Sequence, residues 1–343
     1  MFSPLTQSRI KKFRSIKRAW YSLLILAALF LISLLSEQVA NDHPLLLHYG
    51  GNTYFPTLKF YSGKTFGGPY RTEADYPTLR NDPQFKVRGG WVLMPPIPHS
   101  PLHSYLDLPG NPPHRPSRDH WLGTDGAARD VLARLIYGFR TCMIFALSLT
   151  LVGTVLGIII GGVQGYMGGK TDITVQRLTE IWSALPFLYV VILVGSIYGQ
   201  NFRILLCVTG VFEWITLSYY MRGEFLKLRE QPYVWASKAL GAGHVRILFR
   251  QMLPNAMTPV ITLLPFAIVA GISVLTSLDF LGFGLPPPTP SWGEMIQEGL
   301  QNLQAPWLAT SAVCALFITL MLATFIGEGV RDAFDPKSLT KLQ

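Results

Sequence analysis

Six long stretches with almost no charge constrain this chain of 343 residues more than any other feature. Five of them contain no Asp, Glu, Lys or Arg and cover residues 19–36, 141–169, 181–202, 251–278 and 299–327. The sixth, residues 204–221, contains only Glu213. A helix that spans a bilayer needs about 20 consecutive apolar residues, and a helix satisfies its own backbone polar groups in lipid. The sequence therefore predicts an all-α polytopic membrane protein with six transmembrane helices.

Charge is scarce and unevenly placed. Only 14% of the residues are charged, against about 25% in average soluble domains. Basic residues cluster before residue 19 and again between residues 222 and 250, whereas residues 280–304 contain none. Short cytoplasmic loops are enriched in Lys and Arg, so both termini are expected in the cytoplasm. The net charge of +9 is thus interpreted as a topology signal, and no nucleic-acid partner is expected.

The first uncharged stretch predicts transmembrane helix 1 at residues 19–36, behind a basic cytoplasmic tail of residues 1–18. Its apolar run is longer than the core of a signal peptide, and it lacks a small-x-small cleavage site. We therefore expect it to be retained as an anchor. At the other end of the chain, residues 337–343 are expected to form a short cytoplasmic tail.

Residues 37–121 differ sharply in composition from the stretches on either side. They hold more than half of the 25 prolines and six of the seven histidines. Proline removes a backbone donor and restricts the residue before it, so a run such as "MPPIPHSPLHSYLDLPGNPPHRP" cannot be helical. Aromatic residues are frequent, which argues against disorder. This segment is predicted to be an extracytoplasmic, periplasmic insertion of loops and short strands between helices 1 and 2.

The next segment, "GTDGAARDVLARLIYGFR", has helical periodicity. Thr124 or Asp125 is placed to cap its N-terminus. Its apolar stripe consists of Val131, Leu132, Leu135 and Ile136. Arginines at positions 129, 134 and 140 flank the stripe, so the pattern predicts an interfacial helix that leads into the second span.

A second short helix is indicated between the last two spans, in "DFLGFGLPPPTPSWGEMIQEG". Three consecutive prolines stiffen the turn. Ser291 and Glu294 then match the S-x-x-E pattern of a capping box, which opens a helix.

Motifs for nucleotide, metal or disulfide chemistry fail on spacing. The sequences "GGKT" at 168–171 and "SGKT" at 62–65 lack the earlier glycine that a phosphate-binding loop requires. His99 and His103 have the spacing of metal ligands on a helix, but Pro98 and Pro101 prevent that helix. The three cysteines lie at or within spans and form no disulfide framework. We expect no catalytic residue, no cofactor and no metal site.

Glu213 is the one carboxylate well inside an uncharged stretch. A charged group near the middle of a span costs about 2.5–3.5 kcal/mol, and such residues usually face a polar pathway or a partner. Glu213 is therefore a candidate for the translocation path. The alternative is a structural group that hydrogen-bonds Thr216 or Ser218, or that stays neutral. A proton-driven carrier would need several such groups along the spans.

Residues 233–255, "YVWASKALGAGHVRILFRQMLPN", are basic and broken by glycines, although apolar stretches flank them. Pro232 suits a helix start, and a small apolar face is formed by Ala236, Ala239 and Leu240. The tripeptide Gly241-Ala242-Gly243 ends this helix, because glycine readily adopts the left-handed conformation.

A second short helix is predicted after the glycines and ends at Pro254. Its apolar face is expected to contain Val245, Leu248, Phe249 and Met252, with Arg246 and Arg250 on the other side. A connection between helices usually needs only two to eight residues. Docking of a soluble partner explains the extra length better than a simple turn does.

These residues carry a resemblance to a known family. "SKALGAGHVRILFRQMLPN" resembles the coupling loop of binding-protein-dependent ABC importer permeases, with Gly241 and Leu253-Pro254 at the expected spacing. "GTDGAARDVLARLIYGFR" resembles the GTDxxGRDVxSRxxYGxR signature of the peptide and nickel importers. "LDFLGFGLPPPTPSWGEMI" and "GEGVRDAFDP" are similar to later signatures of that family. The resemblance places a permease domain with five transmembrane helices at residues 122–336.

Two departures from the family pattern affect single residues. Trp235 stands where the family usually has glutamate before the small residues of the coupling helix, and Ala128 stands where glycine is usual. Length and the N-terminal span are those of a C-type permease. The insertion, with "NDHPLLLHYGG" and "FGGPYRTEADY", is similar to the subgroup linked with uptake of oligopeptides and microcin C.

The resemblance implies a non-catalytic, multi-pass subunit in the bacterial inner membrane that imports peptides with energy from ATP. The implied partners are cytoplasmic ABC ATPase subunits, a second homologous permease, a periplasmic peptide-binding protein, the peptide substrate and the lipid bilayer. ATPase docking is assigned to coupling-loop residues Ala236, Ser237, Ala239, Leu240, Gly241, Arg246, Arg250, Leu253 and Pro254.

Alternatives remain open at this point. Within the family, the cargo could be dipeptides or nickel chelates. A secondary transporter would need no ATPase and would show inverted repeats with broken helices. A membrane-bound enzyme would need a cluster of catalytic groups, which the sequence does not indicate.

Overall fold

The chain forms two compact units, seen in a computed structural model that describes residues 4–68 and 71–335. The expected tail at residues 337–343 lies outside the described residues. The first unit comprises Met1–Ala27, Cys142–Pro286 and Leu316–Gln343, and the second comprises Ala28–Thr141 and Pro287–Ala315. Three helices run through both units: α2 (Lys17–Leu34), α6 (Val131–Met167) and α14 (Pro306–Phe334).

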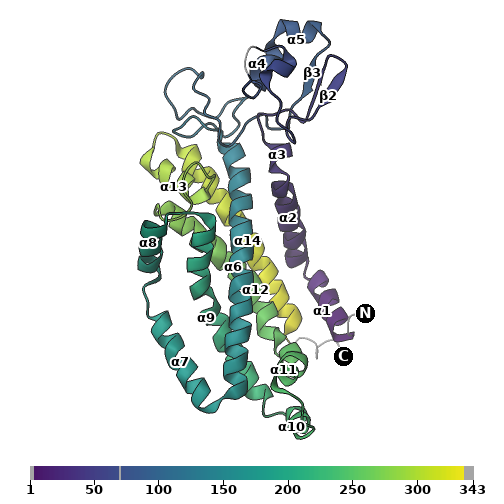
Figure 1. The fold of residues 1–343 in the computed structure, drawn as a ribbon, viewed down its shortest axis with the longest axis vertical. Helices are drawn as coiled ribbons and strands as arrows, with labels where there is room; N and C mark the ends of the chain where they lie inside the picture. The colour runs from purple at the N-terminus through teal and green to yellow at the C-terminus, as the bar shows by residue number, and fades with distance from the viewer. Residues whose placement is uncertain (1–3, 69–70, 336–343) are drawn as a thin grey trace. The chain divides into compact units, whose positions relative to one another are not determined.

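Five helices in the described ranges are long and apolar enough to cross a membrane. They are α2, α6, α9 (Phe202–Leu228), α12 (Met257–Phe280) and α14, and each can be followed in Figure 1. A bent pair, α7 (Gly169–Ser183) and α8 (Phe187–Tyr198), brings the number of spans to six if the pair counts as one. The prediction of an all-α polytopic protein is confirmed. The basic N-terminal tail forms a further helix, α1 (Pro4–Ser15).

The third span differs from the uncharged stretch at residues 181–202 that predicted it. The chain breaks between α7 and α8, and the two helix axes differ by 72°. Pro186 adopts an extended conformation at the break, because proline lacks a donor and disfavours helix in the residue before it. At 1.5 Å per residue, the 12 residues of α8 cover about 18 Å. This is less than the bilayer core of about 30 Å, so the span also needs part of α7.

A row of glycines lets α6 approach α9 closely. Gly153, Gly157, Gly161 and Gly165 recur every four residues and so lie along one face of α6. A Cβ atom added to Gly157 would lie 2.9 Å from Leu217 Cβ, and one added to Gly161 would lie 2.9 Å from Met221 Cβ. Apolar side chains gain little from leaving lipid for a protein interface, so close backbone contact through small residues drives such packing. The sequence analysis missed this repeat.

The second unit contains a small sheet and its own core. Strands β1 (Leu46–Tyr49), β2 (Asn52–Tyr54) and β3 (Trp91–Leu93) form an antiparallel sheet in the order β2-β1-β3. Short helices complete this part of the chain: α3 (Ser36–Val39), η1 (Gly63–Phe66), α4 (Tyr76–Asn81) and α5 (Pro83–Val87). Leu47, Phe66, Ala74, Tyr76 and Phe85 are buried together beneath the sheet. The segment is thus folded around an aromatic core.

The start of α6 corrects the sequence analysis. Neither Thr124 nor Asp125 caps a separate interfacial helix, because α6 begins at Val131 and continues through the membrane span as one helix of 37 residues. Its first turn is capped by Asp130, whose Oδ1 accepts a hydrogen bond of 2.8 Å from the Ala133 amide. Ala128 lies in the preceding turn with φ of 58°, the left-handed region that the glycine of the family pattern would adopt more readily.

Charged residues around this turn form a buried network with α13 (Trp292–Gln301). Arg134 is fully buried, not on an exposed flank, and its Nη2 lies 2.6 Å from Glu294 Oε2. Arg129 Nε lies 2.7 Å from Asp125 Oδ2. The helix α13 begins after Ser291, whose hydroxyl accepts a hydrogen bond from the Glu294 amide, as the S-x-x-E pattern predicts. The Glu294 side chain, however, forms ion pairs with Arg129 and Arg134.

Glu298 extends this network on the same helix. Its Oε1 accepts a hydrogen bond of 2.5 Å from the Gly126 amide in the turn before α6. Burial, and then the nearby charge of Asp125, raise the pKa of Glu298. The network therefore fixes the beginning of α6 to α13 through ion pairs with Glu294 and a hydrogen bond to Glu298, one turn further along α13.

The contact between α6 and α9 gives a direct test. We expect Gly161→Leu to separate the two helices, because the new side chain would meet the Ser218 carbonyl and Met221. Overpacking of this kind costs about 1–3 kcal/mol, so the melting temperature in detergent should fall. Gly223→Leu is the matched control, since open space surrounds Gly223 on α9. Equal melting temperatures for the two variants would contradict the proposed role of the glycine row.

Candidate functional site

The coupling loop, residues 233–255, connects α9 to α12 through several short turns of helix. It contains, in order, α10 (Pro232–Ala239), α11 (His244–Arg246), the π-helix η2 (Ile247–Met252) and the 3₁₀ turn η3 (Leu253–Asn255). Pro232 is at the first turn of α10, where its missing N–H costs nothing. Two helical segments separated by glycines are therefore present, as the sequence predicts.

The bend between these segments is fixed by Gly241. Its φ is +76°, in the left-handed region. The Gly241 amide donates to the Lys238 carbonyl and the Ala242 amide donates to the Ser237 carbonyl, both at 3.0 Å. This pair of hydrogen bonds is the Schellman motif, which satisfies the last carbonyls of a helix and requires a left-handed residue, usually glycine. The bend is thus a defined structure and not a flexible link.

One face of the loop is buried in the first unit. Val234, Ile247 and Met252 are completely buried against Met221 and Phe225 of α9. Tyr166 near the end of α6 and Val260 of α12 belong to the same cluster. The loop is thus packed on three membrane helices, α6, α9 and α12.

The buried face differs from the stripe that the sequence predicts. Leu248 and Met252 are buried as expected, but Val245 is 72% exposed and Phe249 is 48% exposed. The cause is the π-helix at Ile247–Met252, in which hydrogen bonds join residues five apart. This wider turn changes the angle between successive side chains and brings Ile247 into the core. The assumption of α-helical spacing was therefore wrong here.

The nine residues assigned to docking are exposed or half-buried on the outer side of the loop. Ala236, Ala239, Leu240, Gly241, Arg246, Arg250 and Pro254 are exposed, whereas Ser237 and Leu253 are half-buried. Leu240 is 88% exposed. Trp235 is also exposed, at 57%, in the position where the family pattern has glutamate. Leu240 and Trp235 thus give the outer side of the loop exposed apolar side chains on a well-packed support.

A polar contact missed by the sequence analysis joins the loop to α6. The Tyr166 hydroxyl lies 2.8 Å from His244 Nδ1, and the two rings meet edge to face. Lys238 Nζ lies 5.3 Å from the centre of the Tyr166 ring, within range of a cation–π interaction. Tyr166 therefore contacts both segments of the loop at once.

Glu213 lines a cavity of about 200 Å³ between α6, α9 and α12. Thr150 and Thr154 of α6, Thr216 of α9 and Phe266 of α12 are also on its wall. In the part of the chain that the structure describes, the buried Thr150 hydroxyl has no hydrogen-bond partner. Of the two alternative partners expected for Glu213, Ser218 donates instead to the Ile215 carbonyl at 2.7 Å, whereas Thr216 lies on the same cavity wall. The cavity therefore offers polar groups to a guest at membrane depth.

Comparison with known proteins agrees with this architecture. Residues 153–339 match the family described as "Binding-protein-dependent transport system inner membrane component". The chain belongs to this family, and it is an inner-membrane component with several apolar helices. The resemblance found in the sequence motifs is thus confirmed.

Individual relatives extend along nearly the whole chain. The inner membrane ABC transporter permease protein YejE of Escherichia coli is 48% identical over 97% of this chain and 98% of its own length. The peptidoglycan transport system permease protein YejE of Agrobacterium fabrum is 40% identical over 98% of this chain and 94% of its own length. The dipeptide transport system permease protein DppC of Bacillus subtilis is 36% identical over 70% of this chain and 75% of its own length.

Proposed function

We propose that this chain is one of two membrane subunits of an ATP-driven importer of peptides, coupled to cytoplasmic ABC ATPase subunits. The second membrane subunit is a homologous permease, and a periplasmic binding protein delivers the cargo. Both termini and the coupling loop lie in the cytoplasm, and residues 37–121 form the periplasmic insertion. The chain itself is non-catalytic, so its role is to convert movement of the ATPases into opening and closing of the path.

The coupling loop carries this proposal. Its inner face is buried on α6, α9 and α12, while its outer face presents Leu240 and Trp235 to a partner. A partner that displaces the outer face must therefore also displace the three helices. ATP can shift the transporter between its two states only by binding one of them more tightly. Because the loop is rigidly supported, its position differs between the two states, and the ATPases can bind one of them more tightly.

Peptides are the cargo that best fits the relatives. Proteins named for peptidoglycan, dipeptide and oligopeptide transport all align with this chain. The near full-length match to a peptidoglycan transport permease favours cell-wall-derived peptides over dipeptides or nickel chelates. The resemblance of the insertion to the oligopeptide and microcin C subgroup favours the same longer cargoes. Uptake of each class by a strain that lacks this chain separates these possibilities.

The docking role of the loop predicts the effect of a charge at Leu240. We expect Leu240→Asp to abolish co-purification of the ATPase subunits and peptide uptake, because an aspartate would be desolvated in the interface. Val87→Asp is the matched control, since Val87 is 87% exposed on α5 and Leu240 is 88% exposed. Retained co-purification with Leu240→Asp would reject the docking surface.

The cavity predicts a separate effect of Glu213. We expect Glu213→Gln to lower the rate of peptide uptake several-fold while ATPase co-purification stays normal, because the substitution keeps the shape and removes the charge. Glu224→Gln, on the same helix but outside the cavity, is the control. Unchanged uptake with Glu213→Gln would remove Glu213 from the translocation path.

A further inference from the structure

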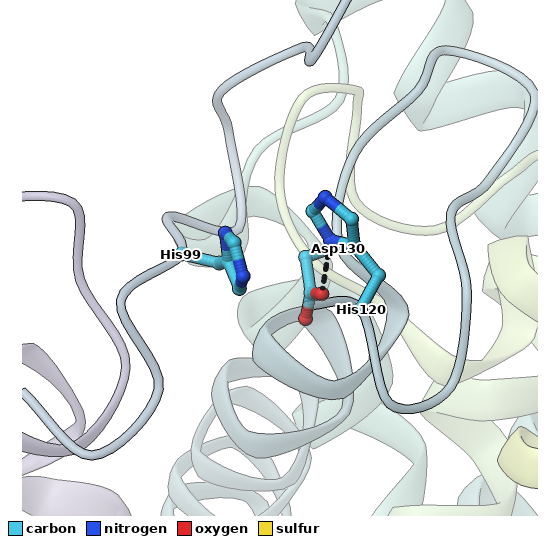
Figure 2. Close-up of side chains that lie close together, drawn as sticks. All are labelled: His99, His120 and Asp130. Atoms are coloured by element: carbon cyan, nitrogen blue, oxygen red, sulfur yellow. Dashed lines mark hydrogen bonds and ion pairs between the residues drawn. The ribbon is translucent and has the colours of Figure 1, made fainter. Parts of the chain in front are cut away.

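Three side chains that could ligate a metal ion meet in the second unit. His99 comes from the proline-rich loop after β3, His120 from the loop before α6, and Asp130 directly precedes that helix. Figure 2 shows the three side chains close together, with a dashed line between His120 and Asp130. One ligand atom from each lies within 4.8 Å of the others. His120 and Asp130 are only 4% and 1% exposed, whereas His99 is half-buried at the edge of the cluster.

The hydrogen bonds of His99 leave one ring nitrogen available. Its Nε2 lies 2.8 Å from the Asp119 carbonyl oxygen. A carbonyl can only accept, so Nε2 carries the hydrogen and Nδ1 keeps its lone pair. In the described ranges, Nδ1 is buried and has no hydrogen-bond partner. A metal-binding histidine has this arrangement, in which the second nitrogen donates to a backbone carbonyl and fixes the ring.

His120 and Asp130 are held in the same way. His120 Nδ1 lies 2.8 Å from Asp130 Oδ2, and Asp130 Oδ1 accepts a hydrogen bond from the Ala133 amide. The carboxylate is therefore fixed by the first turn of α6 and the imidazole by the carboxylate. Both side chains are thereby held in place, and an ion bound by both would replace the hydrogen bond between them with bonds to the metal.

Ring packing explains only part of this arrangement. The His99 and His120 rings are 4.2 Å apart between centroids, and Tyr105 packs against both of them. These contacts account for the close rings but leave the buried His99 Nδ1 without a partner. A buried polar atom without a partner is rare in proteins and needs a physical reason.

The ligand types and their surroundings select the class of ion. Two imidazoles and one carboxylate suit Zn²⁺ and related transition metals, whereas Mg²⁺ and Ca²⁺ prefer oxygen ligands alone. Neighbouring ligand atoms of a tetrahedral Zn²⁺ site lie about 3.4 Å apart, so the three side chains, with ligand atoms within 4.8 Å of one another, would draw closer around an ion. A cavity of about 440 Å³ is lined by His99, Asp130 and Tyr105, which gives an entry path and room for a water ligand.

We propose that His99, His120 and Asp130 form a binding site for a divalent transition metal ion, with Zn²⁺ as the best fit. The ion would join the proline-rich loop to the first turn of α6, because His99 belongs to the loop and Asp130 caps the helix. This site was excluded by the sequence analysis, which paired His99 with His103 on the basis of spacing. His103 Nδ1 instead lies 3.3 Å from Asp42.

The test is Zn²⁺ binding to the purified full-length chain in detergent after removal of metals with a chelator. We expect one ion per chain by calorimetry and by elemental analysis, and a higher melting temperature with Zn²⁺ but not with Mg²⁺. His99→Ala should weaken binding about tenfold or more. It leaves the contact between His120 and Asp130 in place, so the fold should survive.

His103→Ala is the matched control, since it removes a histidine of the same loop that lies outside the cluster. It should bind Zn²⁺ as the unmodified chain does. The proposal is overturned if the unmodified chain binds no Zn²⁺, or if His99→Ala and His103→Ala bind it equally. Either result would show that the cluster is ring packing alone.

Discussion

Close packing of α6 on α9 is the interaction on which the rest of the membrane unit depends. Four glycines on one face of α6 allow contact with backbone atoms of α9, and two of the residues they meet are Met221 and Phe225. The same two residues form the core beneath the coupling loop. In lipid, where burial of apolar groups gives little net gain, this contact relies on the absence of side chains. The packing that supports the loop therefore depends on glycines, which have no side chain.

The loop combines this support with a surface that another protein can reach. Gly241 fixes the bend, Tyr166 joins both segments to α6, and Leu240 stands exposed beyond the bend. A flexible loop would absorb movement of a partner, whereas a packed one passes it to the helices. At the start of α6, the buried pair of Arg134 and Glu294 gives a second fixed point. Buried pairs of this kind are costly to break, because either charge alone would remain desolvated.

Much of the fold could be predicted from the sequence because lipid imposes a simple rule. Long uncharged stretches mark the spans, and Gly241 marks the end of α10 because its conformation is local. Errors arose where tertiary structure overrides spacing. The π-helix at Ile247–Met252 moved Ile247 into the core. The 72° bend lies beside Pro186, a signal inside the uncharged stretch that the sequence analysis did not use. His99 and His120 are separated by a loop without regular periodicity, so no sequence pattern could show that they meet.

The central claim is that the coupling loop and α6 move as one body when the ATPases bind ATP. It is tested by the distance between spin labels at Val245→Cys on α11 and Val163→Cys on α6, two exposed positions outside the docking residues, after replacement of the three native cysteines. The measurement is made on the complete complex, with and without trapped ATP. The account predicts one narrow distance distribution that is the same in both states. A shift of several ångströms, or a broad distribution, would show that the loop moves independently of the helix and would contradict the account.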